Sequence, residues 1–448
     1  MTPFPISEAS PVTFAGPPPA ACDVVVIGGG VIGVMTAWHL ATRGLKVTLC
    51  EKGRIAGEQS SRNWGWIRQQ GRDPAELPIM MESLRQWQAL AGEFGAGLGF
   101  RQTGVMYLAR TDRDMARYEA WLEHARAHGL DTRLLSGTQV RARLDGVQAP
   151  WTGAMFTASD GRAEPWAAVP LLAQGAVARG AVVVEGCAVR ALDVAAGRVV
   201  GVITEHGRIR AGQVVLAGGA WSALLARAHG VNFPQLAVLA SVGATEPLPE
   251  VFAGAAADDR LAFRRREDGG YTLAPADAHD FSIGPDAFRH LRAYLPVLWQ
   301  DFGSTHFHAA APRGYPDGWG TARHWSPDAP GPFEAIRVLN PAPNLATLGR
   351  VQDEFARAFP ALGRPHLRSA WAGMIDTLPD VVPVIDRVAA LPGLTLATGM
   401  SGHGFGIGPG FGRVVADLVM GRATGHDLHR FRLARFTDGS KIAVGSSL

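Results

Sequence analysis

The sequence has 448 residues, of which 47% are hydrophobic and 19% charged, with 43 Lys and Arg against 40 Asp and Glu, a net charge of +3. This composition excludes a disordered or fibrous protein, and the length predicts two domains because it exceeds one ordinary core. The small net charge and the lack of a basic run exclude a nucleic-acid-binding surface. Cys22, Cys50 and Cys187 are scattered without a C-x-x-C, which predicts reduced thiols.

The N-terminal segment, residues 1–20, is rich in proline and lacks both a basic start and an apolar run. It is expected to be a flexible leader rather than a signal peptide. No apolar segment reaches about 18 residues, so no membrane span is predicted. We expect a cytoplasmic protein.

A nucleotide-binding unit is predicted next. The apolar run from Val24 to Ile27 is typical of a buried parallel strand, and it leads into GGGVIG (28–33), a G-x-G-x-x-G turn that opens a helix. Gly28 permits the tight turn, Gly30 lets a pyrophosphate approach the backbone, and Gly33 allows close helix–strand packing. A second strand ends at Glu51, which is placed to accept hydrogen bonds from a ribose. The pattern favours a dinucleotide site over a plain glycine-rich turn, and alone it allows NAD or FAD.

The other elements follow from periodicity and turn residues. Helices are expected over 76–94, 112–128, 165–180 and 352–359, and strands over 104–108, 182–184, 199–205 and 213–216. The alternating pattern of residues 226–375 indicates an antiparallel sheet, and 301–332 receives no assignment. A strand over 394–397 and a helix over 409–420 return to the nucleotide-binding pattern.

Six motifs occur in this order: GGGVIG with Glu51, SSRNWGW (60–66), DGRAEP (160–165), LAGGAWS (216–222), WAGMIDTLPDVVPVID (371–386) and GMSGHGFGIGPGFG (399–412). In these motifs the chain resembles the D-amino-acid oxidase family of FAD-dependent oxidoreductases, which includes glycine oxidase and sarcosine oxidase. The resemblance implies an α/β fold with a Rossmann-like FAD-binding domain and an α+β substrate domain that contains a large antiparallel sheet. We expect the FAD domain at 21–75, 150–225 and 376–435, the substrate domain at 76–149 and 226–375, and a tail at 436–448.

The resemblance also implies the residues that hold FAD. SSRNWGW would run from the pyrophosphate to the flavin, and GMSGHGFG would place a helix N-terminus at the flavin edge that becomes negative on reduction. The expected set is Gly28, Gly30, Val31, Ile32, Gly33, Glu51, Lys52, Ser60, Ser61, Arg62, Asn63, Trp64, Gly65, Trp66, Val189, Ala217, Gly218, Trp221, Met374, Gly402, His403, Gly404, Phe405 and Gly406.

Two departures from the family pattern affect the site. Ile375 stands where glycine-oxidase-like members have the arginine that binds the substrate carboxylate. Arg68, Arg264 and Arg323 are the candidates to replace it, unless the substrate lacks a carboxylate there. The second departure is that no cysteine follows Cys187 and SSRNWGW has no histidine, so we expect FAD to be bound non-covalently.

Catalysis is assigned to His403 and Arg68. His403 lies in the flavin loop, where positioning and general-base roles both remain open, and Arg68 could instead form a surface ion pair. Trp66 and Trp371 are expected in the substrate pocket, with a core position as the alternative for each. No metal site is predicted, because His306, His308 and His324 lack a compact spacing.

These features predict oxidation of the C–N bond of an amino acid or a small amine, by hydride transfer to flavin N5 and hydrolysis of the imine. The electron acceptor would be oxygen or a partner. The main alternative is a flavoprotein dehydrogenase subunit that passes electrons to a partner protein or a quinone. A nicotinamide-dependent dehydrogenase is disfavoured by the C-terminal flavin-type loop. The oligomeric state is left open.

Overall fold

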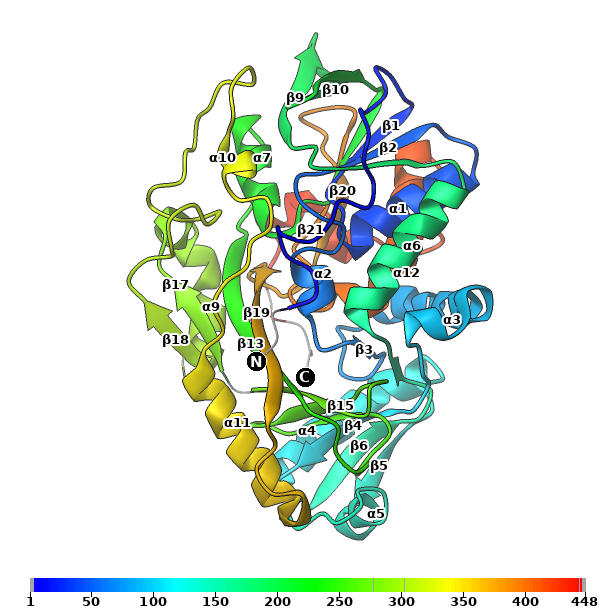
Figure 1. Cartoon of the computed structure of the whole chain (residues 1–448), viewed down its shortest axis with the longest axis vertical. Helices are drawn as coiled ribbons and strands as arrows, with labels where there is room; N and C mark the ends of the chain where they lie inside the picture. Colours follow the sequence, from blue (N-terminus) through cyan, green and yellow to red (C-terminus); the bar gives the residue numbers. More distant parts are fainter. Residues whose placement is uncertain (1–3, 277, 302, 443, 445–448) are drawn as a thin grey trace.

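The computed structural model describes residues 4–276, 278–301, 303–442 and 444. In these residues a largely parallel sheet of six strands runs in the order β20-β21-β12-β1-β2-β8, with the edge strand β20 antiparallel. Its strands are β1 (Val24–Ile27), β2 (Val47–Glu51), β8 (Val182–Glu185), β12 (Gln213–Leu216), β20 (Val384–Arg387) and β21 (Leu394–Thr398). The three predicted segments of the FAD domain therefore contribute to one sheet (Figure 1).

Helices cover this sheet and bury their apolar residues against it and against one another. α1 (Val31–Thr42) packs against α6 (Pro165–Ala178) and α12 (Gly404–Met420), and α12 in turn packs against α3 (Leu77–Phe94). The small residues of α12 allow these close contacts: a Cβ at Gly412 would lie 2.5 Å from the Cβ of Met35. A three-stranded sheet, β9 (Val189–Ala195), β10 (Arg198–Thr204) and β11 (Gly207–Arg210), extends the domain.

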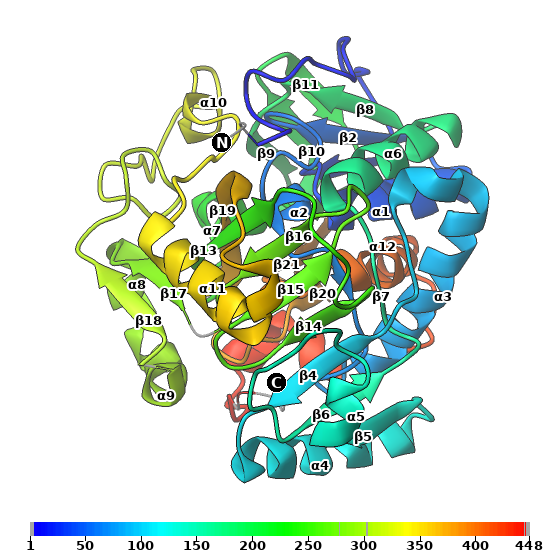
Figure 2. The same cartoon turned by 60° about the horizontal axis from the view of Figure 1, so that its bottom comes forward.

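A mainly antiparallel sheet of ten strands, counted over the described ranges, forms the second domain. Its longest pair is β13 (Leu236–Thr245) with β19 (Leu367–Thr377), and α11 (Leu345–Ala358) lies across the sheet near β13 and β16 (Figure 2). The other strands are β4 (Val105–Ala109), β5 (Thr132–Ser136), β6 (Gly153–Thr157), β14 (Ala255–Ala257), β15 (Ala262–Arg265), β16 (Tyr271–Ala274), β17 (His279–Ser282) and β18 (Thr305–His308).

Short elements connect the two domains. The short antiparallel pair of β3 (Trp66–Ile67) and β7 (Gly161–Arg162) lies beside α12. The remaining helices are α2 (Gln59–Arg62), α4 (Asp112–Ala127), α5 (Gly137–Arg141), α7 (Ser222–Ala228), α8 (Pro285–Arg289), α9 (Leu291–Asp301) and α10 (Pro332–Ala335). In the described part of the chain, no helix is both long and apolar enough to cross a membrane.

Three expectations are corrected by the structure. β6 pairs with β4 and β5, so residues 153–157 belong to the large sheet rather than to the FAD domain. α12 begins at Gly404, five residues before the predicted start, and contains Pro409, whose missing N–H removes one hydrogen bond of the helix. The stretch 301–332, for which no element was predicted, contains the strand β18.

The N-terminal segment, expected to be a flexible leader, is the third correction, since several of residues 4–20 make specific contacts with the rest of the chain. The Phe4 ring lies 5.0 Å from the Trp371 ring, and Arg54 donates to the carbonyls of Ser10 and Glu8. Glu185 accepts from the backbone N–H groups of residues 13 and 14. Residues 1–3 of the expected leader, and 443 and 445–448 of the expected tail, lie outside the described residues.

Candidate active site

A cavity of about 850 Å³ connects the two domains. Its wall includes the glycine turn after β1, the loop 57–66, the start of α12, and residues of β4, β13, β14 and β19. It is therefore lined by every motif assigned to FAD and by the face of the large sheet, which places one continuous site between the nucleotide turn and the second domain.

The glycine turn has the geometry that a pyrophosphate requires. Gly28 has φ +109°, and a Cβ there would lie 2.4 Å from the carbonyl oxygen of Ala217. A Cβ at Gly33 would lie 2.0 Å from the carbonyl oxygen of Gly28, so α1 packs directly on the strand end. A Cβ at Gly30 would meet only Ser60 Oγ, at 3.0 Å, so here the bare backbone faces the cavity. The residues present thus fit the phosphates of a dinucleotide at the N-terminus of α1.

Glu51 ends β2 in the cavity wall. Its carboxylate accepts from the backbone N–H of Gly29 and of Gly53, each at 2.7 Å. Burial raises the pKa of Glu51 to about 7, although Lys52 and these two N–H groups act in the opposite direction. Lys52 itself is held by Glu58 at 2.6 Å and lies over the ring of Trp221, which keeps this wall of the cavity in place.

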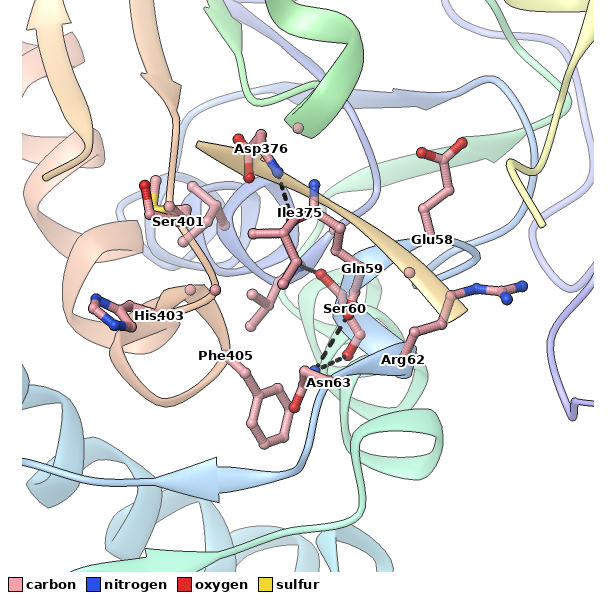
Figure 3. Close-up of a pocket in the computed structure, with 18 of the residues that line it drawn as sticks. Glu58, Gln59, Ser60, Arg62, Asn63, Ile375, Asp376, Ser401, His403 and Phe405 are labelled. Atoms are coloured by element: carbon pink, nitrogen blue, oxygen red, sulfur yellow. Dashed lines mark hydrogen bonds between the residues drawn. The ribbon is translucent and has the colours of Figure 1, made fainter. Parts of the chain in front are cut away.

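The loop with SSRNWGW lies along the cavity (Figure 3). Ser60 Oγ accepts from the N–H of Val31 at 2.8 Å, and Asn63 Oδ1 accepts from Gly65 N–H. The Arg62 guanidinium lines the cavity but donates to Gly57, Asn340, Ala372 and Ile6 rather than standing free for a phosphate. Burial lowers the pKa of Arg62 to about 10. Its contacts make it a structural link between the loop, β19 and the N-terminal segment.

The N-terminus of α12 points its positive end at the cavity. Gly402, His403, Gly404, Phe405 and Gly406 all lie in the wall. A Cβ at Gly406 would meet the backbone of residues 66 and 67 at 3.1 Å, so only glycine allows this approach. Trp87 Nε1 and Ser83 Oγ both donate to the Gly406 carbonyl at 2.8 Å and fix the start of the helix. This arrangement can stabilise negative charge on a bound group.

The substrate side of the wall is mostly small and apolar. Ile375 on β19, Ala240 and Val242 on β13 and Ala257 on β14 face the cavity. The cation among them is Arg68, which follows β3, lies over the Tyr107 ring and has its Nη2 3.2 Å from His403 Nε2. The geometry therefore combines an apolar wall with the guanidinium of Arg68, a pattern typical of small-molecule sites.

Two arginines considered for the substrate do not reach this wall. Arg264 is fully buried, and its guanidinium binds Glu164 at 2.9 and 3.1 Å and the Trp64 carbonyl. Arg323 binds Asp317 at 3.0 Å in the segment before α10. Both are occupied by other partners, so Arg68 is the candidate that the structure leaves at the cavity.

Some predicted residues lie just behind the wall. Trp371 donates to the Arg62 carbonyl at 2.9 Å and packs on Phe4. Ser61 is fully buried and Met374 packs with Leu339 in a small core cluster. The predicted residues that the cavity wall does not include are Gly33, Ser61, Gly65, Trp371, Met374, Arg264 and Arg323. The other predicted residues line it.

Sequence reasoning missed several residues of the site. Glu76 and Arg72 lie behind His403 and form a buried ion pair at 2.8 Å. Tyr107, Ala240 and Asp376 line the wall, and Asp376 accepts from Gly399 N–H, with its pKa raised by burial. Glu76 had one local signal, since it precedes a helix and follows Arg72 by four residues. The others come from strands whose facing direction depends on distant pairing.

His306, His308 and His324 do not form a metal centre in the part of the chain that the structure describes. Over the described ranges, no group of three His, Cys, Asp or Glu side chains is arranged to hold a metal ion. His308 instead lies 2.7 Å from Asp280.

The comparison with protein families agrees with this geometry. A family model described as FAD dependent oxidoreductase matches residues 23–418. The chain belongs to this family. It is thus an FAD-dependent flavoenzyme.

Two solved structures and several curated proteins are similar to this flavoenzyme. L-amino acid deaminase from Proteus myxofaciens, in complex with anthranilate, is 30% identical with a TM-score of 0.90, and 97% of each chain is covered. The deaminase from Proteus vulgaris is also 30% identical, with a TM-score of 0.89 over 96% of this chain and 100% of that one. Sarcosine oxidase subunit beta of Rhizobium meliloti (strain 1021) is 26% identical over 94% of this chain and 89% of its own length. Human mitochondrial sarcosine dehydrogenase is 24% identical over 94% of this chain, which spans 42% of that protein.

Proposed function

We propose that this flavoenzyme oxidises the C–N bond of an amino acid that carries an apolar side chain. The observation that carries the proposal is the single cavity in which Arg68 and His403 face an apolar wall formed by Ala240, Val242, Ala257 and Ile375. The names of the similar proteins support it, because they act on amino acids or on sarcosine.

Each part of the chain has a role in this proposal. Bound FAD supplies the hydride acceptor. Arg68 would bind the substrate carboxylate, because a guanidinium binds a carboxylate through two parallel hydrogen bonds. The apolar wall would hold the side chain and exclude water. His403 would take the proton of the ammonium group, so that the nitrogen lone pair can assist loss of hydride from carbon.

The test is anaerobic mixing of the purified yellow protein with a panel of amino acids, N-methyl amino acids and simple amines. Loss of the flavin absorbance with apolar amino acids would support the proposal. No loss with any C–N substrate would contradict it. Readmitting air then measures how fast oxygen accepts the electrons, and acid precipitation tests the predicted non-covalent attachment, because free FAD should stay in the supernatant.

A second candidate is a dehydrogenase that passes electrons to a partner protein or a quinone. A group of exposed apolar side chains over α8, α9, β18 and the segment after it favours this reading, and Trp299 in it is 85% exposed. The members are Phe288, Leu291, Leu295, Trp299, Phe307 and Trp319. A patch of this kind is typical of an interaction surface. Slow reoxidation by air together with fast reoxidation by a soluble quinone would favour this candidate over an oxidase.

We also propose that the protein works in the reducing cytoplasm. Cys50 and Cys187 support this, because they are free thiols that contact each other in the core, and the contact with Cys187 together with burial raises the pKa of Cys50. Counting free thiols in the protein purified without reductant tests the proposal. Loss of two thiols to a disulfide would contradict it.

A further inference from the structure

Glu76 lies behind the cavity wall and faces His403, which is part of the wall. Glu76 is the N-cap residue of α3, has no exposed surface, and its Oε2 lies 3.7 Å from His403 Nδ1. Among the residues that the structure describes, neither Glu76 Oε1 nor His403 Nδ1 has a hydrogen-bond partner, and both atoms are buried. Figures 1 and 2 show α3 beside α12, the helix that His403 precedes. The unpaired ring nitrogen of His403 thus lies beside a carboxylate that has one oxygen, Oε2, on Arg72 and the other, Oε1, still able to accept a hydrogen bond.

The partners of His403 select one form of its ring. Arg68 Nη2 lies 3.2 Å from Nε2, and a guanidinium can only donate, so Nε2 must be the unprotonated nitrogen. In the neutral ring the proton then resides on Nδ1, where the nearby group is a carboxylate that can only accept. The two sides of the ring therefore demand the same tautomer.

Charges around the ring keep it in the state that this tautomer requires. Burial lowers the pKa of His403, Glu76 acts to raise it, and Arg68 and Arg72 act to lower it further. Burial opposes ionisation of Glu76, but His403 and Arg72 outweigh it and lower the pKa of Glu76 to about 2. His403 is thus neutral beside an anionic Glu76, and Tyr107 and Asp160 are further titratable groups near Arg68.

The carboxylate is also held rigidly. Arg72 Nη1 donates to Glu76 at 2.8 Å, while its Nη2 donates to the His403 carbonyl at 3.0 Å and its Nε to the Arg68 carbonyl at 2.7 Å. Trp121 Nε1 fixes the Arg72 carbonyl at 3.0 Å. One arginine thereby links Glu76 to the backbone of both residues that meet at the cavity.

We propose that Glu76 is a positioning residue that holds His403 in the Nδ1–H tautomer and presents Nε2 to the cavity as the proton acceptor. This inference rests on the proposed function. When a substrate carboxylate binds Arg68, Nε2 becomes free. One N–H bond of the substrate ammonium breaks, an N–H bond forms at Nε2, and the new imidazolium charge faces Glu76. The ring needs to move by only about 0.5–1 Å for Nδ1 to reach hydrogen-bonding distance of Glu76.

The first test is nuclear magnetic resonance of the holoenzyme with ¹⁵N-labelled histidine, in which His403→Gln identifies the signals of His403 among the 14 histidines. We expect a protonated, pyrrole-type Nδ1 and a pyridine-type Nε2 at neutral pH. A protonated Nε2 in the neutral ring overturns the proposal. This measurement needs neither a substrate nor a Glu76 variant that folds, so it decides the proposal even if the proposed function fails.

The second test compares E76Q with E82Q. Glu82 lies on the same helix and also pairs with an arginine and a histidine, Arg413 and His426, but away from the cavity wall. In E76Q the amide can donate to Nδ1 as well as accept, so the tautomer becomes mixed. Anaerobic flavin reduction should slow by about 10²-fold, and the acid limb of its pH profile should move to lower pH because the imidazolium loses its anionic neighbour.

The control E82Q should keep the wild-type rate and profile, and E76D, which retains the carboxylate, should recover part of the rate. An unchanged pH profile and tautomer in folded E76Q would overturn the proposal, as would an equal loss in E82Q. Failure of the proposed function has a different outcome, in which the wild type itself is not reduced by any amino acid.

Discussion

Arg68 and His403 meet at 3.2 Å across the start of α12 although 335 positions separate them in the chain. Arg68 also donates to the Gln70 carbonyl, which orients its guanidinium toward the cavity. The contact places Arg68 at the flavin loop in the cavity wall, whereas Arg264 and Arg323 bind other partners. Under the proposed function, Arg68 would bind the substrate carboxylate in place of the arginine that Ile375 replaces.

Replacing Arg68 by methionine should therefore weaken binding of carboxylate substrates. The loss of a charge-assisted, bidentate contact corresponds to a rise in KM of about 10- to 100-fold for an amino acid. The KM for the matching amine without a carboxylate should change little. Steady-state kinetics with the two substrates measures the difference. R323M is the control and should behave as wild type, and an equal loss for both substrates would show that Arg68 acts on something other than the carboxylate.

The nucleotide-binding part could be predicted from sequence because its signals are local. In the turn after β1, Gly28 has φ +109° and a Cβ at Gly33 would meet the carbonyl oxygen of Gly28, so these two requirements arise within six residues. The strands and helices around it follow from apolar periodicity over short windows. β2 ends at Glu51 as predicted, and α6 ends at Ala178, two residues before its predicted end.

The substrate side could not be predicted in the same way, because its contacts are long-range. Ala240 faces the cavity only because β13 pairs with β19, a strand more than 100 positions later. Arg264 is unavailable because Glu164, 100 positions earlier, binds it in the core. Neither pairing leaves a local pattern, so the sequence identified the right residue types for the site without saying which arginine reaches it.

The apolar wall predicts how substrate size is selected. Ala240→Phe adds a large side chain to a wall of small residues and should exclude amino acids with long or aromatic side chains. The expected loss in kcat/KM is about 10- to 200-fold for a bulky apolar amino acid, with a much smaller change for alanine. Kinetics with a graded series of amino acids measures the effect. Ala287→Phe, in α8 outside the cavity wall, is the control; uniform loss over the series in A240F would contradict a size filter.

The buried ion pair of Arg264 and Glu164 predicts a large effect on stability. Arg264→Met leaves Glu164 without its partner in a fully buried place, which should lower the free energy of unfolding by about 3–5 kcal/mol. The Arg101–Glu267 pair is the contrast, because Arg101 is largely exposed, and R101M should change stability by about 0–1 kcal/mol. Urea unfolding of both variants measures the difference. Equal effects would show that the buried pair has no special weight.

The environment of Glu51 predicts that FAD binding depends on pH. In the absence of FAD its pKa is raised by burial from the ordinary 4.5 to about 7, so the apo-protein retains a proton that the unfolded chain loses. Stability of the apo-protein from this group is therefore fully present below pH 4.5, falls as the pH rises toward 7, and then levels off. Ribose hydroxyl groups donate to the carboxylate and favour its ionised form, so the pKa should drop when FAD binds.

It follows that the affinity for FAD should rise with pH through about 7 and then become constant. A drop of one pKa unit on binding corresponds to about tenfold in affinity, or about 1.4 kcal/mol, between pH 5.5 and 8. Fluorescence titration of the apo-protein with FAD measures the slope. E51Q should bind FAD more weakly and without this pH dependence, whereas E93Q, which alters an exposed ion pair with Arg179, should keep the wild-type slope. A slope that persists in E51Q would place the titrating group elsewhere, and an affinity that falls with pH would show that Glu51 binds the ribose in its protonated form.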